Sequence, residues 1–241
     1  MTAPRAPRAP RAPRAPRAPR AIVFDAYGTL FDLASALPAA PTSEIPNPAA
    51  LARLWREKQL QYTWLRSLAG QYVDFDQVTE HALDHALAAL RLNPEAQSRA
   101  RLLAAMCALT PYPEVSVVLL KLRAARMATA ILSNGTPATL ARLLGNAGLG
   151  QAFDHVLSAD SVRAFKTDPS VYTLATATFA VPPGDLVFVS SNAWDAQAAA
   201  AFGFRVFWCN RAVMPAENLP GLPAHEAPTL ESLPGWVAGL A

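Results

Sequence analysis

Helix-like and strand-like patterns alternate along the second half of the chain. Apolar runs of strand length occur at residues 128–132, 154–157, 186–189 and 205–208. Each run follows a stretch with helical spacing of its apolar positions, at about residues 114–125, 137–147, 170–179 and 196–202. Such alternation is typical of βαβ units, and it predicts an α/β fold with a doubly wound parallel sheet.

The first half of the chain carries a different pattern. One apolar run, residues 21–24, has the character of a buried strand. From residue 31 to about residue 107 no convincing strand follows, and we expect helices from Asn47-Pro48 to about Leu65, at 76–92 and at 95–109. These patterns predict an all-helical cap subdomain at residues 31–111, inserted into a core domain of residues 21–30 and 112–241.

Polar residues follow the apolar runs at the points where strands are expected to end. They are Asp25 after the first run, Ser133 and Asn134 after the second, Lys166 after the apolar pair 164–165, and Ser190, Asn192 and Asp195 after residues 186–189. In open α/β sheets, ligands bind outside the carboxyl ends of the strands, so we expect these side chains to meet. The pair Gly28-Thr29 lets the chain turn after Asp25 and present backbone N–H groups to an anion. Asp25 is therefore a candidate carboxylate nucleophile, with a turn-capping aspartate as the structural alternative.

These motifs, in this order and with the helix 54–66 between the first two, resemble the haloacid dehalogenase superfamily. More narrowly, residues 21–210 are similar to the L-2-haloacid dehalogenases. The resemblance implies that short-chain L-2-haloalkanoic acids are hydrolysed to D-2-hydroxyalkanoic acids. In that reaction Asp25 attacks C2 with inversion and forms an ester, which water then hydrolyses. The resemblance also implies a homodimer.

The roles of the other site residues are implied by the same resemblance. Lys166 would keep Asp25 ionised, and Tyr172 would support Lys166 by a hydrogen bond. Asp195, together with Ser190, Asn192 and Thr29, would position Lys166 and the hydrolytic water. The substrate carboxylate would be held by Ser133, Asn134 and the backbone N–H groups that follow Asp25, from Ala26 onward.

The cap is expected to contribute the group that meets the leaving halide. By resemblance this group is Arg56, whose cation would stabilise charge that develops in the transition state; an ordinary exposed helix arginine is the alternative. An apolar slot for the halogen and the alkyl chain would be lined by Tyr27, Leu60, Phe75 and Trp194. Glu57 departs from the family pattern, in which glutamine is common, and its orientation bears on the substrate range.

Tyr27 separates two reaction classes. Phosphatases of the superfamily carry a second aspartate two residues after the nucleophile, which protonates the alkoxide leaving group. Tyr27 stands at that position here, and a halide leaves without a proton. In the loop after residues 186–189, Asp195 is the only acidic residue, whereas Mg²⁺ is usually bound by carboxylates. We therefore expect no metal and no cofactor, and a Mg²⁺-dependent phosphatase is the alternative.

The N-terminus departs from the rest of the chain, because Ala-Pro-Arg repeats six times up to Arg20. Proline at every third position forbids a helix, so residues 1–20 are expected to form a disordered tail. The tail holds six of the 21 basic residues, which leaves fifteen against eighteen acidic ones in the core and cap. The net charge of +3 therefore does not indicate a nucleic-acid-binding core. A non-catalytic protein whose arginine tail recruits an acidic partner is a second alternative.

No apolar stretch approaches the ~18 residues that a membrane span requires, and the tail lacks the apolar segment of a secretory signal. The two cysteines, Cys107 and Cys209, lie in apolar contexts and indicate no disulfide framework. We expect a cytoplasmic protein that acts on a small molecule.

Overall fold

A parallel sheet in the order β5-β4-β1-β6-β7-β8 organises the chain in this computed structural model, which describes residues 18–39 and 43–240. All neighbouring strands of this sheet are parallel. The strands are β1 (Ala21–Phe24), β4 (Ala128–Ser133), β5 (His155–Ser158), β6 (Leu186–Ser190), β7 (Arg205–Cys209) and β8 (His225–Ala227). The tail predicted for residues 1–20 lies outside the described residues as far as residue 17.

Strand β1 lies at the centre of the sheet, between β4 and β6. Val23 pairs with Ala130 on one side and with Phe188 on the other. All four residues of β1 are fully buried, as expected for a parallel strand covered on both faces, and this explains its uninterrupted apolar sequence. The residue after β1, Asp25, therefore begins the loop at the centre of the sheet's carboxyl edge.

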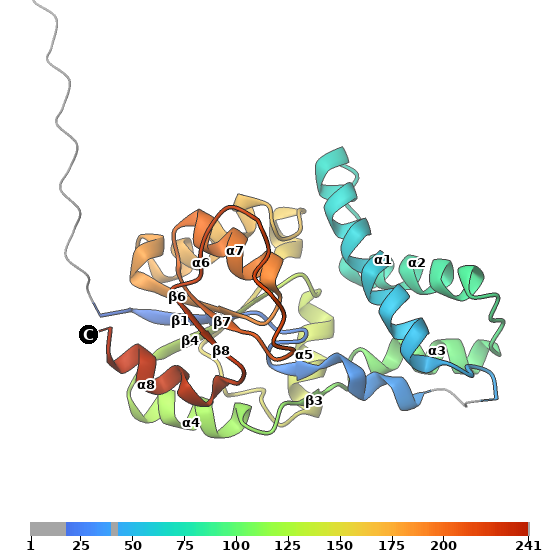
Figure 1. Ribbon diagram of the computed structural model, residues 1–241, viewed down its shortest axis with the longest axis horizontal. Coiled ribbons are helices and arrows are strands. Elements are labelled where there is room, and N and C mark those ends of the chain that lie inside the picture. The colour runs from blue at the N-terminus through green and yellow to red at the C-terminus, as the bar shows by residue number, and fades with distance from the viewer. Residues whose placement is uncertain (1–17, 40–42, 241) are drawn as a thin grey trace, which may run out of the picture.

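Two apolar cores cover the two faces of the sheet. Ile22 and Phe24 contribute to one core, and Ala21 and Val23 contribute to the other, because successive strand residues point to opposite faces. Helices α4 (Val115–Ala124), α5 (Pro137–Asn146) and α8 (Leu233–Ala238) pack on the first face. Helices α6 (Pro169–Phe179) and α7 (Ala193–Phe202) pack on the second (Figure 1). The predicted doubly wound α/β fold is confirmed.

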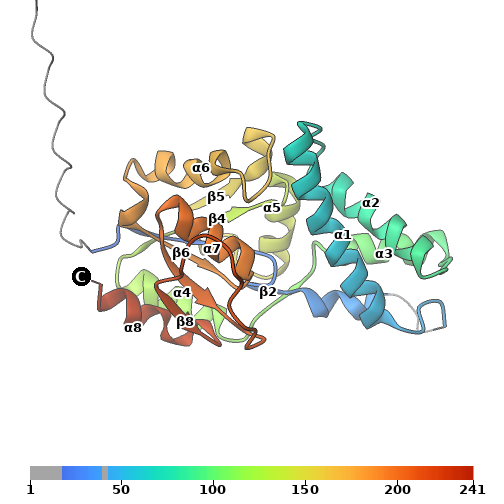
Figure 2. The same ribbon diagram turned by 45° about the horizontal axis from the view of Figure 1, so that its top comes forward.

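Three further helices lie beside the carboxyl edge of the sheet, away from its two faces (Figures 1 and 2). They are α1 (Pro48–Ala69), α2 (Phe75–Ala89) and α3 (Ala96–Ala105). Helix α1 begins where the sequence predicts, because the Asn47 side chain accepts a hydrogen bond from the Ala50 amide. The indole of Trp55 donates to the Thr79 carbonyl at 2.8 Å and joins α1 to α2.

The chain enters and leaves these three helices through a short antiparallel ribbon. Strand β2 (Phe31–Asp32) pairs with β3 (Thr110–Pro111), and Phe31 lies opposite Pro111. The prediction that residues 31–107 contain no strand is wrong at Phe31–Asp32, because two paired residues are too few to give a sequence pattern. Strand β8 was also missed, since it is a short edge strand in a proline-rich segment.

Four short 3₁₀ helices complete the described structure: η1 (Leu33–Ala39), η2 (Ala159–Val162), η3 (Pro183–Asp185) and η4 (Leu230–Ser232). Cys107 and Cys209 are both buried and free. Among the helices of the described ranges, none has both the length and the apolar character that crossing a bilayer requires.

Helix α4 offers a direct test of the packing on the first face. Leu122 is 1% exposed and Leu120 is 66% exposed on the same helix. We expect Leu122→Ala to lower the free energy of unfolding by about 2–5 kcal/mol, because it leaves a cavity in the core. Leu120→Ala is the matched control and should change it by less than about 0.5 kcal/mol. Urea denaturation of both variants measures the difference, and equal effects would contradict this packing.

Candidate active site

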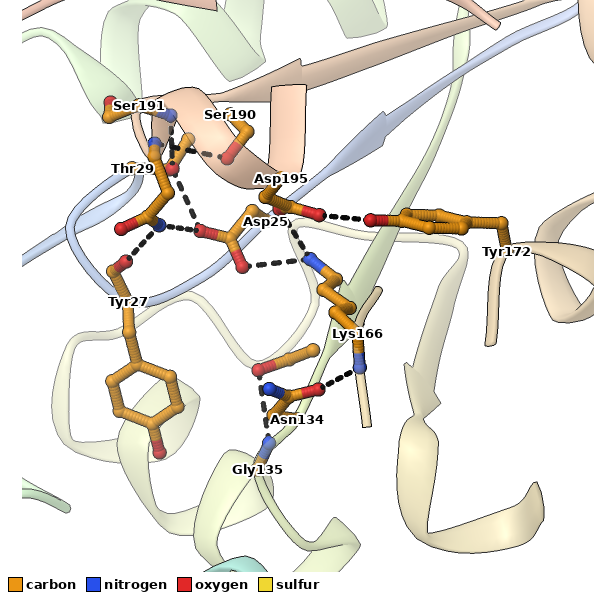
Figure 3. A network of polar contacts seen from close by, with 12 residues as sticks. Asp25, Tyr27, Thr29, Asn134, Gly135, Lys166, Tyr172, Ser190, Ser191 and Asp195 are labelled. Atoms are coloured by element: carbon orange, nitrogen blue, oxygen red, sulfur yellow. Dashed lines mark hydrogen bonds and ion pairs between the residues drawn. The ribbon is translucent and has the colours of Figure 1, made fainter. Parts of the chain in front are cut away.

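Asp25 lies directly after the central strand and is 6% exposed. Its backbone amide donates to the Val189 carbonyl at 2.8 Å, which continues the pairing of β1 with β6. Its carboxylate accepts three hydrogen bonds. Thr29 Oγ1 and Asn192 Nδ2 each donate to Oδ2 at 2.9 Å, and Lys166 Nζ donates to Oδ1 at 2.9 Å (Figure 3). The turn that brings Thr29 back to Asp25 passes through Gly28, whose φ of 83° suits glycine.

Lys166 bridges two carboxylates in the interior of the protein. Its ammonium, 1% exposed, donates to Asp25 and also to Asp195 Oδ2 at 2.9 Å (Figure 3). The expectation that Lys166 follows a strand is wrong, because the neighbouring strand β5 ends at Ser158 and Lys166 lies in the loop between η2 and α6. Hydrogen bonds hold this loop in place instead: the Lys166 amide donates to Asn134 Oδ1 at 2.9 Å, and the Phe165 amide donates to Ser67 Oγ at 3.0 Å.

The opposite charges of Lys166 and of the carboxylates of Asp25 and Asp195 stabilise one another. Burial alone lowers the pKa of Lys166, but the attraction of Asp195 and Asp25 outweighs burial, and the pKa is raised. Burial raises the pKa of Asp195, and Lys166 opposes that rise. The ammonium of Lys166 therefore stays protonated at neutral pH and faces Asp25 as a fixed positive charge.

Tyr172 supports the site through Asp195. Its hydroxyl donates to Asp195 Oδ1 at 2.8 Å, so the prediction that Tyr172 binds Lys166 directly is wrong. Tyr172 lies on α6 and approaches Asp195 from the side opposite Asp25 (Figure 3). Burial, and then the charge of Asp195, raise the pKa of the Tyr172 hydroxyl well above its usual value. The tyrosine thus remains a hydrogen-bond donor and fixes the carboxylate that holds Lys166.

Asn192 and Thr29 bind Asp25 rather than Lys166. Asn192 donates from Nδ2 to Asp25 and to the Tyr27 carbonyl at 3.1 Å. Thr29 Oγ1 donates to Asp25 and accepts from the Ser191 amide at 2.8 Å. Ser190 Oγ accepts from the Asn192 amide at 3.2 Å. Of the group predicted to position Lys166, only Asp195 contacts it, while Thr29 and Asn192 orient the nucleophile candidate itself.

Arg56 reaches the site from α1. Its Nη2 donates to Asn192 Oδ1 at 3.5 Å, and its Nη1 donates to Gln59 Oε1 at 2.7 Å. Burial lowers the pKa of Arg56, and the charge of Asp25 opposes this change; an arginine so placed stays charged. Gln59, which sequence reasoning missed, is held by Thr79 Oγ1 at 2.7 Å. Its position three residues after Arg56, on the same helix face, was the available signal.

Glu57 points away from this arrangement. Its side chain is exposed on α1, whereas the neighbouring Arg56 is half-buried. The acid that departs from the family pattern is therefore on the solvent side of the helix.

The two side chains expected to bind the substrate carboxylate lie at the carboxyl end of β4, beside β1: Ser133 is its last residue, and Asn134 follows it. Ser133 is fully buried, and its Oγ accepts from the Gly135 amide at 3.2 Å. Asn134 Oδ1 accepts a hydrogen bond from the Lys166 amide at 2.9 Å, so this side chain holds the loop that carries Lys166. Ala26 is buried in the turn after Asp25, where its carbonyl accepts from the amides of that turn.

The apolar residues divide into two aromatic contacts. The rings of Tyr27 and Phe75 lie 5.6 Å apart, and burial raises the pKa of Tyr27 above its usual value. The rings of Trp194 and Trp64 lie 5.5 Å apart. Trp194, Trp64 and Tyr172 help to line a cavity of about 660 Å³ next to the site. Leu60 is half-buried one turn after Arg56.

Residues 18–39 and 43–240 hold no group of three or more His, Cys, Asp and Glu side chains placed to bind a metal ion. The polar groups that meet here are a carboxylate nucleophile candidate, a fixed ammonium and a guanidinium. This set can attack an electrophilic carbon and stabilise an anionic leaving group.

Comparison with known proteins identifies the family. A family model described as a haloacid dehalogenase-like hydrolase matches residues 19–203. The chain belongs to the haloacid dehalogenase-like hydrolases. Within them it is 40% identical over 216 residues to the (S)-2-haloacid dehalogenase H-109 of Pseudomonas putida, an alignment that covers 90% of this chain and 96% of the relative. The family resemblance predicted from the sequence is confirmed.

Two solved structures of L-2-haloacid dehalogenases extend the comparison. The structure of the enzyme RSc1362 superposes on this chain with a TM-score of 0.89 and 42% sequence identity. The match covers 92% of this chain and 100% of the RSc1362 chain. The Xanthobacter autotrophicus enzyme with chloropropionic acid covalently bound gives a TM-score of 0.85 and 37% identity, again covering 92% and 100%.

Removing the central ammonium tests the electrostatics of this haloacid dehalogenase-like site. We expect Lys166→Met to abolish turnover and to lower the free energy of unfolding by about 3–5 kcal/mol near pH 8, because two buried carboxylates lose their cation. Lys166 opposes the raised pKa of Asp195, so its loss raises that pKa further. A folded-state pKa above the unfolded one gives stability that is present at low pH and lost as pH rises.

The destabilisation should therefore be smaller near pH 5 than near pH 8 when it is measured by urea denaturation. Lys121→Met, at an exposed lysine of α4, is the control. A loss of equal size at both pH values would contradict this account of the site.

Proposed function

We propose that this chain hydrolyses short-chain L-2-haloalkanoic acids to D-2-hydroxyalkanoic acids and halide. The observation that carries the proposal is the pairing of Asp25 with Lys166 at 2.9 Å beside Tyr27, where a phosphatase would need an acid. This combination supplies a carboxylate nucleophile but lacks, at residue 27, the carboxylic acid with which phosphatases of the superfamily protonate an alkoxide leaving group. The covalently bound chloropropionic acid in the related Xanthobacter autotrophicus structure supports an ester pathway.

In the first step, a carboxylate oxygen of Asp25 attacks C2 from the face opposite the halogen. The new C–O bond forms as the carbon–halogen bond breaks, and the halide leaves with the bonding electron pair. Arg56 meets the departing halide, and its charge is more strongly attracted to the product anion than to the neutral carbon–halogen bond. Ser133, Asn134 and the amides from Ala26 onward hold the substrate carboxylate.

In the second step, water attacks the ester carbonyl carbon of Asp25. The bond between that carbon and the substrate oxygen breaks, and the released hydroxy acid takes a proton from water. Asp25 returns to its ionised form beside Lys166, and the sum of both steps releases one halide and one proton. Asp195, held by Tyr172 and Lys166, positions the water.

The proposal includes the wider organisation of the protein. Residues 31–111 act as a cap over a core of residues 21–30 and 112–241, and the short ribbon β2–β3 supports this division. The enzyme works as a cytoplasmic homodimer that needs neither metal nor cofactor. Size-exclusion chromatography with light scattering tests the dimer, and full activity in EDTA tests the metal requirement.

Stereospecific halide release is the decisive measurement. We expect the purified protein, in EDTA, to release chloride from L-2-chloropropionate and none from the D form. Asp25→Ala should abolish release, because it removes the nucleophile and leaves no amide that water could convert back to aspartate. In solvent enriched in oxygen-18, a single turnover should place label in the Asp25 carboxylate. Phosphate release from phosphoesters with Mg²⁺, and no chloride from either enantiomer, would reverse the assignment.

The cap arginine gives a second prediction. We expect Arg56→Met to lower kcat for L-2-chloropropionate by about 10²–10³-fold, because a donor aimed at developing charge is lost. Arg53→Met is the matched control, since Arg53 is exposed on the same helix. The bromide substrate should be affected less than the chloride, as bromide is the better leaving group. A kcat within about twofold of the wild type would remove Arg56 from the leaving-group role.

A further inference from the structure

We infer that Arg211 is a positioning residue that fixes the nucleophile turn and, through the same side chain, anchors the hinge of the proposed cap. Arg211 follows β7 by two residues, at the same carboxyl edge of the sheet as Asp25. It forms no hydrogen bond or ion pair with Asp25 or Lys166, and it acts through the backbone of Thr29. The expected fall in kcat rests on the proposed function. The expected loosening of the turn at residues 26–31 does not.

The guanidinium of Arg211 makes three different contacts. Its Nη2 donates to the Thr29 carbonyl at 2.8 Å. Its Nη1 forms an ion pair with Glu114 Oε1 at 2.7 Å, and both side chains are largely buried. Its flat face lies over the ring of Tyr112, with the guanidinium carbon 3.6 Å from the ring centroid. The three contacts fix both the position and the plane of the guanidinium.

The Thr29 carbonyl matters because the rest of Thr29 is tied to the nucleophile. Thr29 Oγ1 donates to Asp25 Oδ2 at 2.9 Å and accepts from the Ser191 amide at 2.8 Å. A turn that shifted at Thr29 would carry this hydroxyl away from the carboxylate. Arg211 thus holds the backbone of Thr29, and the side chain of Thr29 orients Asp25.

The other two contacts connect the turn to the hinge. Tyr112 directly follows β3, and its amide donates to the Leu30 carbonyl at 3.0 Å, so both chain segments that lead to the proposed cap meet beside Arg211. Glu114 precedes α4 and also accepts from the Leu230 amide at 3.3 Å. Arg211 therefore joins Thr29 and Tyr112, from the two crossing segments, to the fixed start of a core helix.

Only arginine fits all three contacts. A lysine ammonium is a compact charge that cannot bridge the Thr29 carbonyl and Glu114 with a planar fork or stack on Tyr112. We expect Arg211→Lys to lower kcat for L-2-chloropropionate about 10- to 100-fold, because small displacements of a nucleophile are costly in rate. KM should change by a smaller factor than kcat, since Ser133 and Asn134, the side chains proposed to bind the substrate carboxylate, lie outside this turn.

Hydrogen exchange followed by mass spectrometry supplies a readout that needs no substrate. In Arg211→Lys the amides of residues 26–31 should exchange faster than in the wild type, while those of α6 stay unchanged. Glu114→Gln keeps the bond to Thr29 but weakens its anchor, and it should give a smaller effect of the same kind. Arg123→Lys, at an exposed arginine of α4, is the control for both measurements.

Two results would overturn the inference. The first is unchanged exchange at residues 26–31 together with wild-type kcat. The second is faster exchange throughout the sheet with a lower Tm and a kcat that recovers on cooling, which would make Arg211 a residue of general stability. If the wild type itself releases no halide, the proposed function fails, and the exchange pattern alone decides whether Arg211 holds the turn.

Discussion

A single buried ammonium shared by two carboxylates constrains the whole carboxyl edge of the sheet. Three charges removed from water are tolerated only when they lie close together and their remaining lone pairs and protons are satisfied. Lys166 contacts Asp25 and Asp195, Tyr172 takes the outer oxygen of Asp195, and hydrogen bonds from Thr29 and Asn192 complete Asp25. The turn after β1, the start of α7 and the loop before α6 must therefore converge on one point.

The second cation of the site belongs to a different part of the chain. Arg56 lies on α1, and its distance from Asp25 depends on how the three helices sit against the sheet. Several contacts set that position: the Asp76 carboxylate accepts from the hydroxyls of Thr136 and Thr139, and Tyr72 donates to Asp160 at 2.6 Å. The proposed reaction thus needs two parts of the chain: the sheet, which carries the nucleophile Asp25, and helix α1, which carries Arg56 to meet the leaving halide.

The sequence predicted what depends on local pattern and missed what depends on packing. The central strand followed from its apolar run, and the start of α1 from Asn47-Pro48. The meeting of Lys166 with Asp25 and Asp195 was expected from the family resemblance, because Lys166 follows no strand. The hydrogen-bond partner of Tyr172 could not be predicted, because a motif indicates which residues are close but not whether Tyr172 binds Lys166 or Asp195. Arg211 was missed because it acts through the backbone of Thr29, which is distant in sequence. Gln59 was missed although its spacing from Arg56 was available.

The ribbon β2–β3 has a consequence for how such a protein can be altered. Phe31 lies opposite Pro111, so the two ends of the intervening segment are separated by one strand spacing, about 4.8 Å. A segment whose ends nearly coincide can be lengthened, shortened or exchanged while the pairing of β1 with β4 and β6 stays in register. Residues 33–109, which include Arg56, can therefore vary in length and sequence without disturbing the sheet that carries Asp25. Recombination at this junction would exchange the three helices beside Asp25 and leave the strands of the sheet unchanged.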